Sequence, residues 1–285
     1  MPPNLEGVVH DLPDAEYHAH PALSSTGARM LLPEYKGSPR KFQYAQTHRR
    51  DTVAFDIGTA THSKVLGIGS RIVIYPKEHL TPSGAVSTKK ETVAWEQEQR
   101  ANGLVPIGAA DARRVDGMAE AVLKHPTAGP ILEWATGREV SVFAEIDGVP
   151  VRARFDALSS DGAAVDLKTT DDATPSGFAK SVAKWGYDVQ EAWYDDVHDA
   201  ATGVPLGAFY FIVVEKSAPY EVAVHRLPEL WVEMGRTKAA EARRIYRECV
   251  ETGVWPGYDT DVQFLDPPAW MVYDHEARYE EEIRI

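Results

Sequence analysis

The chain has 285 residues, of which 44% are hydrophobic and 26% charged, a composition typical of a globular protein. Its 43 acidic residues outnumber its 30 basic ones, so the net charge of −13 repels nucleic acid at long range, and any polyanion site must be locally basic. Cys249 is the only cysteine, which excludes an intramolecular disulfide and a cysteine-based metal cluster and favours a reducing cytoplasm.

The first 135 residues are predicted to be mainly helical. They begin without the basic and apolar segments of a signal peptide, which also favours a cytoplasmic location. Ser24 and Ser25 precede a short helix that Pro33 ends. Residues 35–50 then hold five basic residues and no acidic one. Further helices are expected over residues 58–66, 91–99 and 109–124.

Three strands with apolar and polar residues in alternation follow this helical part. They are expected over residues 139–146, 151–156 and 163–168. Turns that contain Asp-Gly join them, which indicates an antiparallel meander. Glu139 and Glu145 lie on its polar face and could add a carboxylate to a functional site there, but we interpret them as solvated edge charges.

The rest of the chain predicts helices around one apolar strand. Pro175 begins a helical region that Gly186 interrupts, and the second part covers residues 188–201. The strand 206–214 is too short to span a bilayer, so no membrane association is expected. A long amphipathic helix over 229–252 precedes an irregular aromatic tail. We expect one α/β or α+β domain with a mixed central sheet flanked by helices, in which residues 1–135 are a helical elaboration, 136–225 the core and 226–285 the C-terminal helix and tail.

Two carboxylates and a lysine are the candidates for chemistry. Side chains two positions apart share one face of a strand, so Asp166 and Lys168 lie together, and the hairpin can bring Asp156 to them. Two neighbouring carboxylates repel each other unless a cation lies between them, and hard oxygen ligands suit Mg²⁺ or Mn²⁺. A nearby lysine could orient or deprotonate water. The alternative is an exposed strand face with a surface ion pair.

Two helical features lie before and after this hairpin. Gln190 and Tyr194 are four positions apart and therefore share one face of their helix. His62 lies in the helix expected over 58–66. Taken singly, the Gln–Tyr pair is typical of an amphipathic boundary and the histidine of a core residue.

The order of these residues along the chain is more specific than any one of them. His62, Asp156, Asp166-Leu167-Lys168 and Gln190 to Tyr194 together resemble the PD-(D/E)xK nuclease superfamily, in its RecB-type branch. Many members have glutamate where this chain has Asp166. The resemblance narrows to the phage RecE-like (exonuclease VIII type) exonucleases through residues 17–27, 58–62, 165–170 and 255–258, and it covers about residues 15–270.

The resemblance implies a restriction-endonuclease-like core and a metal-dependent DNA exonuclease. It assigns one or two Mg²⁺ or Mn²⁺ ions to His62, Asp156, Asp166 and the carbonyl of Leu167. Lys168 would position or activate the attacking water. Gln190 and Tyr194 would organise the metal site or hold the DNA backbone.

The resemblance also implies a substrate and partners. Relatives degrade linear duplex DNA from its 5′ end, in phage recombination or replication, and leave a 3′ strand for a single-strand annealing protein. They often form homo-oligomeric rings that thread the duplex. Arg152, Arg154, Lys168 and the basic residues of 36–50 would line such a channel here. Ser24, Ser25 and Arg29 would recognise a 5′-phosphate at a helix start, with helix capping by serine as the alternative.

Three other functions stay open at this point. The first is a RecB-like nuclease that acts on single strands or flaps. The second is a catalytically inactive DNA- or partner-binding module with the same fold, against which the intact set of Asp156, Asp166 and Lys168 argues. The third is an unrelated hydrolase with paired carboxylates, such as a glycosidase, which would need neither a metal nor the lysine.

Overall fold

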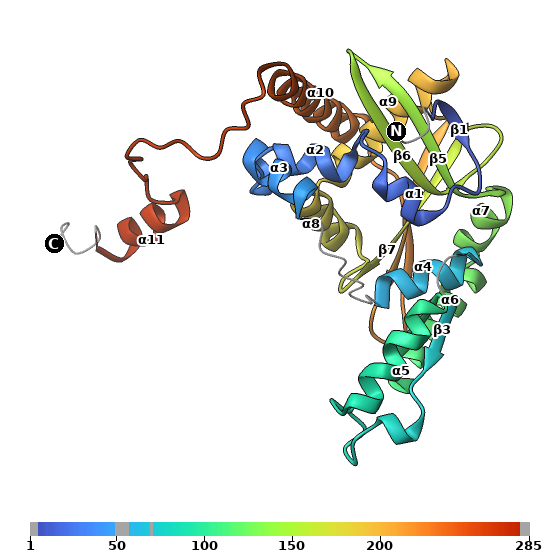
Figure 1. The fold of residues 1–285 in the computed structure, drawn as a ribbon. Coiled ribbons are helices and arrows are strands. Elements are labelled where there is room, and N and C mark those ends of the chain that lie inside the picture. The colour runs from blue at the N-terminus through green and yellow to red at the C-terminus, as the bar shows by residue number, and fades with distance from the viewer. Residues whose placement is uncertain (1–4, 49–56, 69–70, 280–285) are drawn as a thin grey trace.

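A seven-stranded mixed sheet lies at the centre of the molecule (Figure 1). The computed structural model describes residues 5–48, 57–68 and 71–279. The strand order is β1 (Gly7–Val9), β5 (Gly137–Ile146), β6 (Val149–Leu158), β7 (Ala163–Thr170), β8 (Ala208–Glu215) and β9 (Val222–His225), and β2 (Leu23–Ser24) pairs with β6. β7 and β8 are parallel, as are β2 and β6, whereas the other pairs are antiparallel. The predicted meander is thus confirmed as β5, β6 and β7.

A tight turn joins the first two strands of the meander. Asp147 and Gly148 both have positive φ, +53° and +75°. This backbone matches the twist of a two-residue hairpin, and Asp-Gly is a sequence that adopts it at low cost. The turn therefore fixes the register in which Ile146 faces Val149.

Helices cover both faces of the sheet. One face packs against α2 (Ser25–Leu31), α8 (Pro175–Trp185), α9 (Tyr187–Thr202) and α10 (Glu229–Thr252), and the other against α4 (Ile57–Leu66), α6 (Ala109–Lys124) and α7 (Ala128–Trp134). The alternation along β8 shows the two cores directly. Phe211 and Val213 belong to the first core, whereas Ile212 and Val214 belong to the second. Both faces of the central strands are therefore buried in apolar cores.

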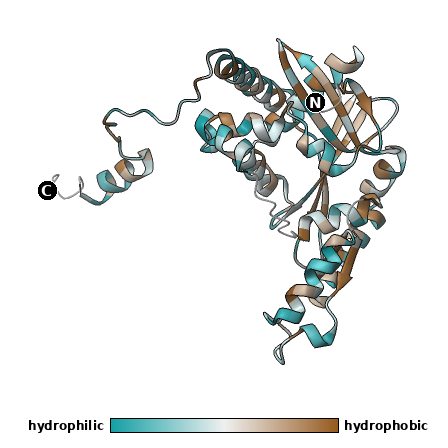
Figure 2. Cartoon of the chain, in the orientation of Figure 1, coloured by the Kyte–Doolittle hydropathy of each residue, from teal (hydrophilic) through white to brown (hydrophobic). Residues whose placement is uncertain are grey.

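The other α-helices and strands lie outside this sandwich, although Phe42, within residues 39–47, still packs into the first core. They are α1 (Asp14–Ala19), α3 (Pro39–Thr47), α5 (Lys90–Ala101), α11 (Ala269–Tyr279) and a separate parallel pair of strands, β3 (Arg71–Ile74) and β4 (Leu104–Ile107). Hydrophilic residues cover much of α5 (Figure 2). In the described part of the chain, no helix is both long and apolar enough to span a membrane.

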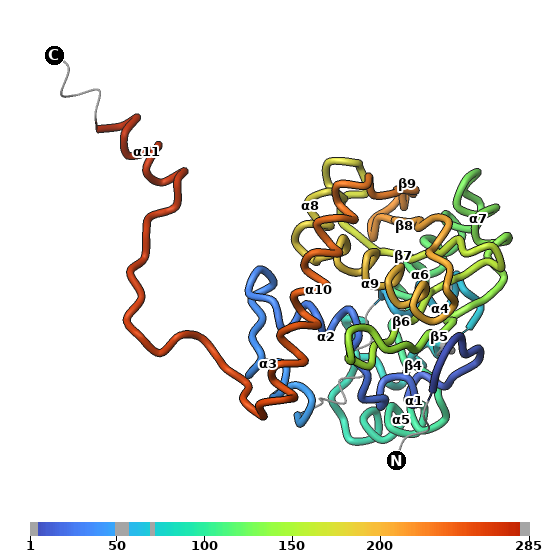
Figure 3. Tube along the Cα trace, turned by 90° about the horizontal axis from the view of Figure 1, so that it is seen from above, coloured from blue at the N-terminus to red at the C-terminus, as the bar shows by residue number. Residues whose placement is uncertain are grey.

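The structure contains several elements that the sequence analysis did not predict, among them the strands β1, β2 and β9 and the helix α7. The parallel pair β3–β4 was not expected, because each strand is only four residues long and gives too short a period to detect. The tail expected to be irregular contains α11, which lies apart from the rest of the molecule (Figures 1 and 3). Arg49 and Arg50, the last bases of the segment 35–50, lie outside the described residues.

Candidate active site

The strands β6 and β7 separate at the predicted acidic residues. Their register pairs are Ala157 with Val165 and Leu158 with Ala164, and the ladder does not continue to Asp156. Beyond this point a side chain replaces the backbone hydrogen bond between the two strands. Asp156 Oδ2 accepts a hydrogen bond from the N–H of Leu167 at 2.7 Å. The carbonyl of Leu167 points to the same side of its strand as this N–H, since both groups of one residue do so in a strand.

Asp166, Lys168 and Gln190 form a closed set of contacts beside this gap. Asp166 is only 3% exposed, and its Oδ2 lies 2.6 Å from Lys168 Nζ. Gln190 Nε2 donates to Asp166 Oδ1 at 2.5 Å, and its Oε1 accepts from Lys168 Nζ at 3.1 Å. Gln190 therefore holds the acid and the lysine at once. The ring of Tyr187 lies 4.6 Å from Lys168 Nζ and covers it from another side.

His62 reaches the site from the opposite face of the sheet. It lies on α4, and its Nδ1 is 3.3 Å from Asp156 Oδ2. Burial opposes the charge of His62, but the carboxylates of Asp156 and Asp166 raise its pKa above the ordinary value. The structure thus brings His62 to Asp156, while the predicted role of His62 as a metal ligand stays a prediction.

The two carboxylates differ in electrostatic environment. Burial disfavours the charge on Asp156, yet His62, Lys168 and the Leu167 N–H hold the pKa of Asp156 below its usual value. Burial raises the pKa of Asp166 even though Lys168 opposes the shift, and the charge of Asp156 adds to the rise. Two acids whose pKa values are pushed apart in one place are typical of a functional site.

Tyr194 supports the site from the core. It is 9% exposed and packs edge-on against Phe155 at 4.9 Å between ring centroids. Burial raises its pKa well above 10.0, so the hydroxyl stays neutral beside Gln190. Tyr194 is thus placed to position Gln190.

Arg152 and Arg154 have a structural position that differs from the one expected in a DNA channel. Arg152 is 7% exposed, and its Nη1 donates to the carbonyls of Tyr17 and His20. Arg154 donates to the carbonyl of Leu12 at 2.6 Å, among other contacts. Both guanidinium groups therefore tie the N-terminal segment to the sheet. Alternation along the strand showed that they share a face, but not that residues 12–20 cover it.

Ser24 and Arg29 also make contacts within the protein. Ser24 Oγ accepts from the N–H of Gly27 at 3.2 Å, which confirms helix capping. Ser25 is buried, and its carbonyl accepts from Arg29 Nε at 3.3 Å. Arg29 Nη1 donates to the carbonyl of Trp185, at the end of α8. Recognition of a 5′-phosphate by these residues stays a prediction.

Glu139, interpreted from the sequence as a solvated edge charge, is half-buried near the site. It lies opposite Asp156 in the register of β5 and β6, between the pairs of Arg138 with Ala157 and Val140 with Phe155. Its φ of +44° is rare for a residue other than glycine. Burial raises the pKa of Glu139, and the Asp156 charge contributes. The alternation placed Glu139 on a polar face, but no local pattern in the sequence signals its left-handed backbone.

The donor set is suited to a hard divalent cation. Asp156, Asp166, His62 and the carbonyl of Leu167 supply carboxylate, imidazole and carbonyl atoms. Asp166 Oδ2 is buried and has no hydrogen-bond partner among the described residues, although the Lys168 ammonium is near. Within the described residues, however, no three His, Cys, Asp or Glu side chains already form a metal-binding group. His62 and Lys168 instead neutralise the two acids, and metal binding stays a prediction.

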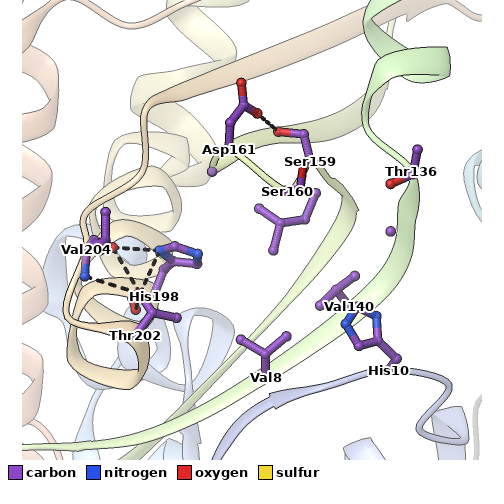
Figure 4. A pocket seen from close by; sticks show the side chains of 13 residues that line it. Val8, His10, Thr136, Val140, Ser159, Ser160, Asp161, His198, Thr202 and Val204 are labelled. Carbon is purple, nitrogen blue, oxygen red and sulfur yellow. Dashed lines mark hydrogen bonds between the residues drawn. The ribbon is translucent and has the colours of Figure 1, made fainter.

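A cavity of about 510 Å³ is formed by a different set of residues (Figure 4). Val8, His10, Val140 and His198 belong to its wall, and none of the predicted site residues does. His198 Nδ1 is 2.8 Å from the carbonyl of Val204, so the imidazole is engaged in local structure. This cavity contributes nothing to the candidate site.

Comparison with known proteins identifies the fold and the family of the chain. No curated protein matches the chain. A structure from Eubacterium rectale, named as a candidate exonuclease, is similar over 93% of this chain and 98% of its own, with 14% identity and a TM-score of 0.59. A phage-related exonuclease from Haemophilus somnus 129PT covers 70% of this chain and 97% of its own, with 12% identity and a TM-score of 0.33. The first likeness shows a shared fold. Residues 38–266 match the family described as PDDEXK-like domain of unknown function (DUF3799), and the chain belongs to this family.

Proposed function

We propose that the chain is a metal-dependent deoxyribonuclease, an exonuclease of the RecE-like type that acts on linear duplex DNA. One observation carries the proposal: Asp156, Asp166 and Lys168 meet where β6 and β7 separate, in a chain of the PDDEXK-like family. This set of groups is what hydrolysis of a phosphodiester needs, namely anionic donors for a cation and a positive charge near the phosphate.

Each residue would have a distinct part in the reaction. Asp156 and Asp166 would hold a divalent ion, together with His62 and the Leu167 carbonyl. The bound ion would supply Lewis-acid stabilisation of charge on the phosphate. The ammonium of Lys168 is held by Gln190 and would orient the attacking water or stabilise the charge that develops on a phosphate oxygen. Water would replace the leaving oxygen on phosphorus, so that one phosphodiester bond is hydrolysed.

The finer assignments rest on the resemblance to the RecE-like exonucleases. They are cleavage from the 5′ end, a role in phage recombination or replication, a homo-oligomeric ring and a single-strand annealing protein as partner. A RecB-like nuclease acting on single strands or flaps is the second candidate, because the same catalytic set would serve it. An inactive binding module is disfavoured by the engaged Lys168–Asp166–Gln190 contacts.

Cleavage of end-labelled DNA tests the proposal. Linear duplex, closed circular duplex, single strands and flapped duplex would each be incubated with Mg²⁺ or Mn²⁺. We expect loss of 5′ label from the linear duplex while circles persist, and no cleavage by Asp166→Asn. Asp199→Asn is the matched control, since Asp199 is exposed on α9, and it should cleave normally. Cleavage by Asp166→Asn at the rate of the unmodified protein would refute the site assignment.

A further inference from the structure

A basic pocket adjoins the candidate active site and has no assigned role. Its volume is about 310 Å³, and Lys168 forms part of its wall. Three more lysines line it, Lys180 and Lys184 on α8 and Lys216 after the end of β8. Because the whole chain has a net charge of −13, four lysines around one pocket are a local reversal of the average surface.

The lysines of α8 are presented to solvent together. Lys180 and Lys184 are four positions apart on the helix that follows β7 in the chain (Figure 1), so they share one face. Both side chains are exposed. Among the described residues Lys184 has no carboxylate in an ion pair with it, and its Nζ instead lies 4.6 Å from the centre of the Trp185 ring.

The acidic residues of the pocket are already engaged. Asp172 Oδ1 accepts from the N–H and the hydroxyl of Thr174, at 2.9 and 2.6 Å, and so stabilises the start of α8. Asp171 is 90% exposed and lies 3.4 Å from Lys216. Asp172 also interacts electrostatically with Lys180, whereas no carboxylate among the described residues pairs with Lys184. The positive charge of Lys184 is therefore fully available to an anionic ligand, and that of Lys180 is available in part.

An exposed aromatic side chain stands at the rim of this pocket. Trp185 is 51% exposed, although a tryptophan would ordinarily be mostly buried. Its backbone is fixed, because Arg29 donates to its carbonyl and the next residue, Gly186, ends α8 with φ +67°. An exposed ring on a rigid backbone, next to lysines, is the combination with which proteins hold single-stranded nucleic acid.

We propose that this pocket binds backbone phosphates of the DNA strand next to the scissile bond, and that Trp185 stacks on one of its bases. The inference rests on the proposed nuclease function and extends it. Lys168 would belong to both regions, so the strand would pass directly from the lysines of α8 to the catalytic groups. The pocket would make two different kinds of contact with the strand. The lysines would bind its phosphates through their charge, and Trp185 would stack on a base.

Equilibrium binding of labelled DNA tests this pocket without any cleavage. The full chain with Asp166→Asn would be titrated into a fluorescent single-stranded oligonucleotide and a blunt duplex, in chelator and at several salt concentrations. Adding Lys180→Ala and Lys184→Ala should weaken binding and reduce the slope of log affinity against log salt by about one to two. Adding Trp185→Ala should weaken single-strand binding about 5- to 100-fold with an unchanged slope, and Trp185→Phe should restore most of it.

Matched controls come from the same chain. The pair Lys89→Ala and Lys90→Ala removes the same charge at the start of α5, and Trp134→Ala removes another half-exposed ring. Neither control should change affinity or slope. Unaltered binding in the α8 lysine variant, or an equal loss in its control, would overturn the inference even if the protein cleaves DNA. Failure of the unmodified protein to cleave any DNA would instead reject the proposed nuclease function. The binding comparison would still show whether the pocket binds DNA.

Thermal melting of each variant completes the design. Lys180, Lys184 and Trp185 are exposed, so their substitution should leave the melting temperature within a few degrees of the parent. Should Lys180→Ala with Lys184→Ala unfold, the pair Lys180→Gln and Lys184→Gln removes the same charge and keeps the aliphatic stems. Normal DNA binding by that pair would also overturn the inference.

Discussion

Asp156 has a structural task that can be separated from its proposed chemical one. Its carboxylate accepts the buried N–H of Leu167 at the point where β6 no longer pairs with β7. Asp156→Ala removes this acceptor and leaves the N–H without a partner in a residue that is 0% exposed. Asp156→Asn keeps an oxygen in the same place and should preserve the bond in a weaker, neutral form.

The expected magnitudes follow from this one hydrogen bond. An unpartnered buried N–H costs about 1–3 kcal/mol, so Asp156→Ala should destabilise the fold by about 2 kcal/mol. For a chain of this size that lowers the melting temperature by about 3–4 °C. Asp156→Asn should lose about half as much, since a neutral acceptor is weaker than a charged one. Both variants should lose DNA cleavage, because neither keeps the negative charge.

The assay is thermal and denaturant unfolding in chelator, so that no bound cation contributes. Asp199→Ala is the control, because Asp199 is exposed and distant from the strand gap. The reasoning would be refuted if Asp156→Ala were as stable as this control, or if the alanine and asparagine variants unfolded at the same denaturant concentration. Retention of cleavage by Asp156→Asn would refute the chemical role alone.

Three further predictions concern pH and packing. His62→Gln should cost more stability near pH 5.5 than near pH 8.5, because a histidine whose pKa is raised above 6.5 stabilises the fold in its charged form, below that value. If urea unfolding shows the same loss of stability for His62→Gln at both pH values, His62 and Asp156 do not form an ion pair. Burial raises the pKa of Glu191 to about 8, so its charge destabilises the fold as pH rises from 4.5 upward. Glu191→Gln should therefore raise the free energy of unfolding by about 2–4 kcal/mol near pH 8.5 and change it little near pH 4.5. Denaturation curves that shift by the same amount at both pH values would contradict this. Gly235→Ala should destabilise by about 1–3 kcal/mol, since a Cβ would overlap the backbone carbonyl of Asp188 where α10 meets α9. An unchanged denaturation midpoint would mean that the two helices do not approach so closely.

Local patterns in the sequence were sufficient for the strands and turns that carry the site. The alternation around Asp156 and Asp166 and the Asp-Gly turn at 147–148 depend on neighbours in the chain, so they could be recognised without tertiary information. The helix that presents Gln190 also follows from local signals, because Gly186 ends one helix and begins the next.

Features that depend on what covers a surface were not predictable in this way. Arg152 lies on a polar-looking strand face, yet the N-terminal segment buries it and takes up its hydrogen bonds. Glu139 has a left-handed backbone that no residue type in the segment demands. Lys180 and Lys184 look like ordinary surface lysines, and only the fold places them beside Lys168.

The rate of DNA hydrolysis by a Lys168 variant tests the central claim most directly. Linear duplex would be incubated with Mg²⁺ and either the unmodified chain, Lys168→Met or Lys124→Met, a control at an exposed lysine of α6. The site described above predicts rapid release of nucleotides by the unmodified chain and the control. It predicts a loss of at least about 100-fold in rate for Lys168→Met, assayed at a temperature at which melting curves show this variant to be folded, because Lys168 also neutralises the buried Asp166. Hydrolysis by Lys168→Met at the rate of the control would contradict the proposal that this site performs the reaction.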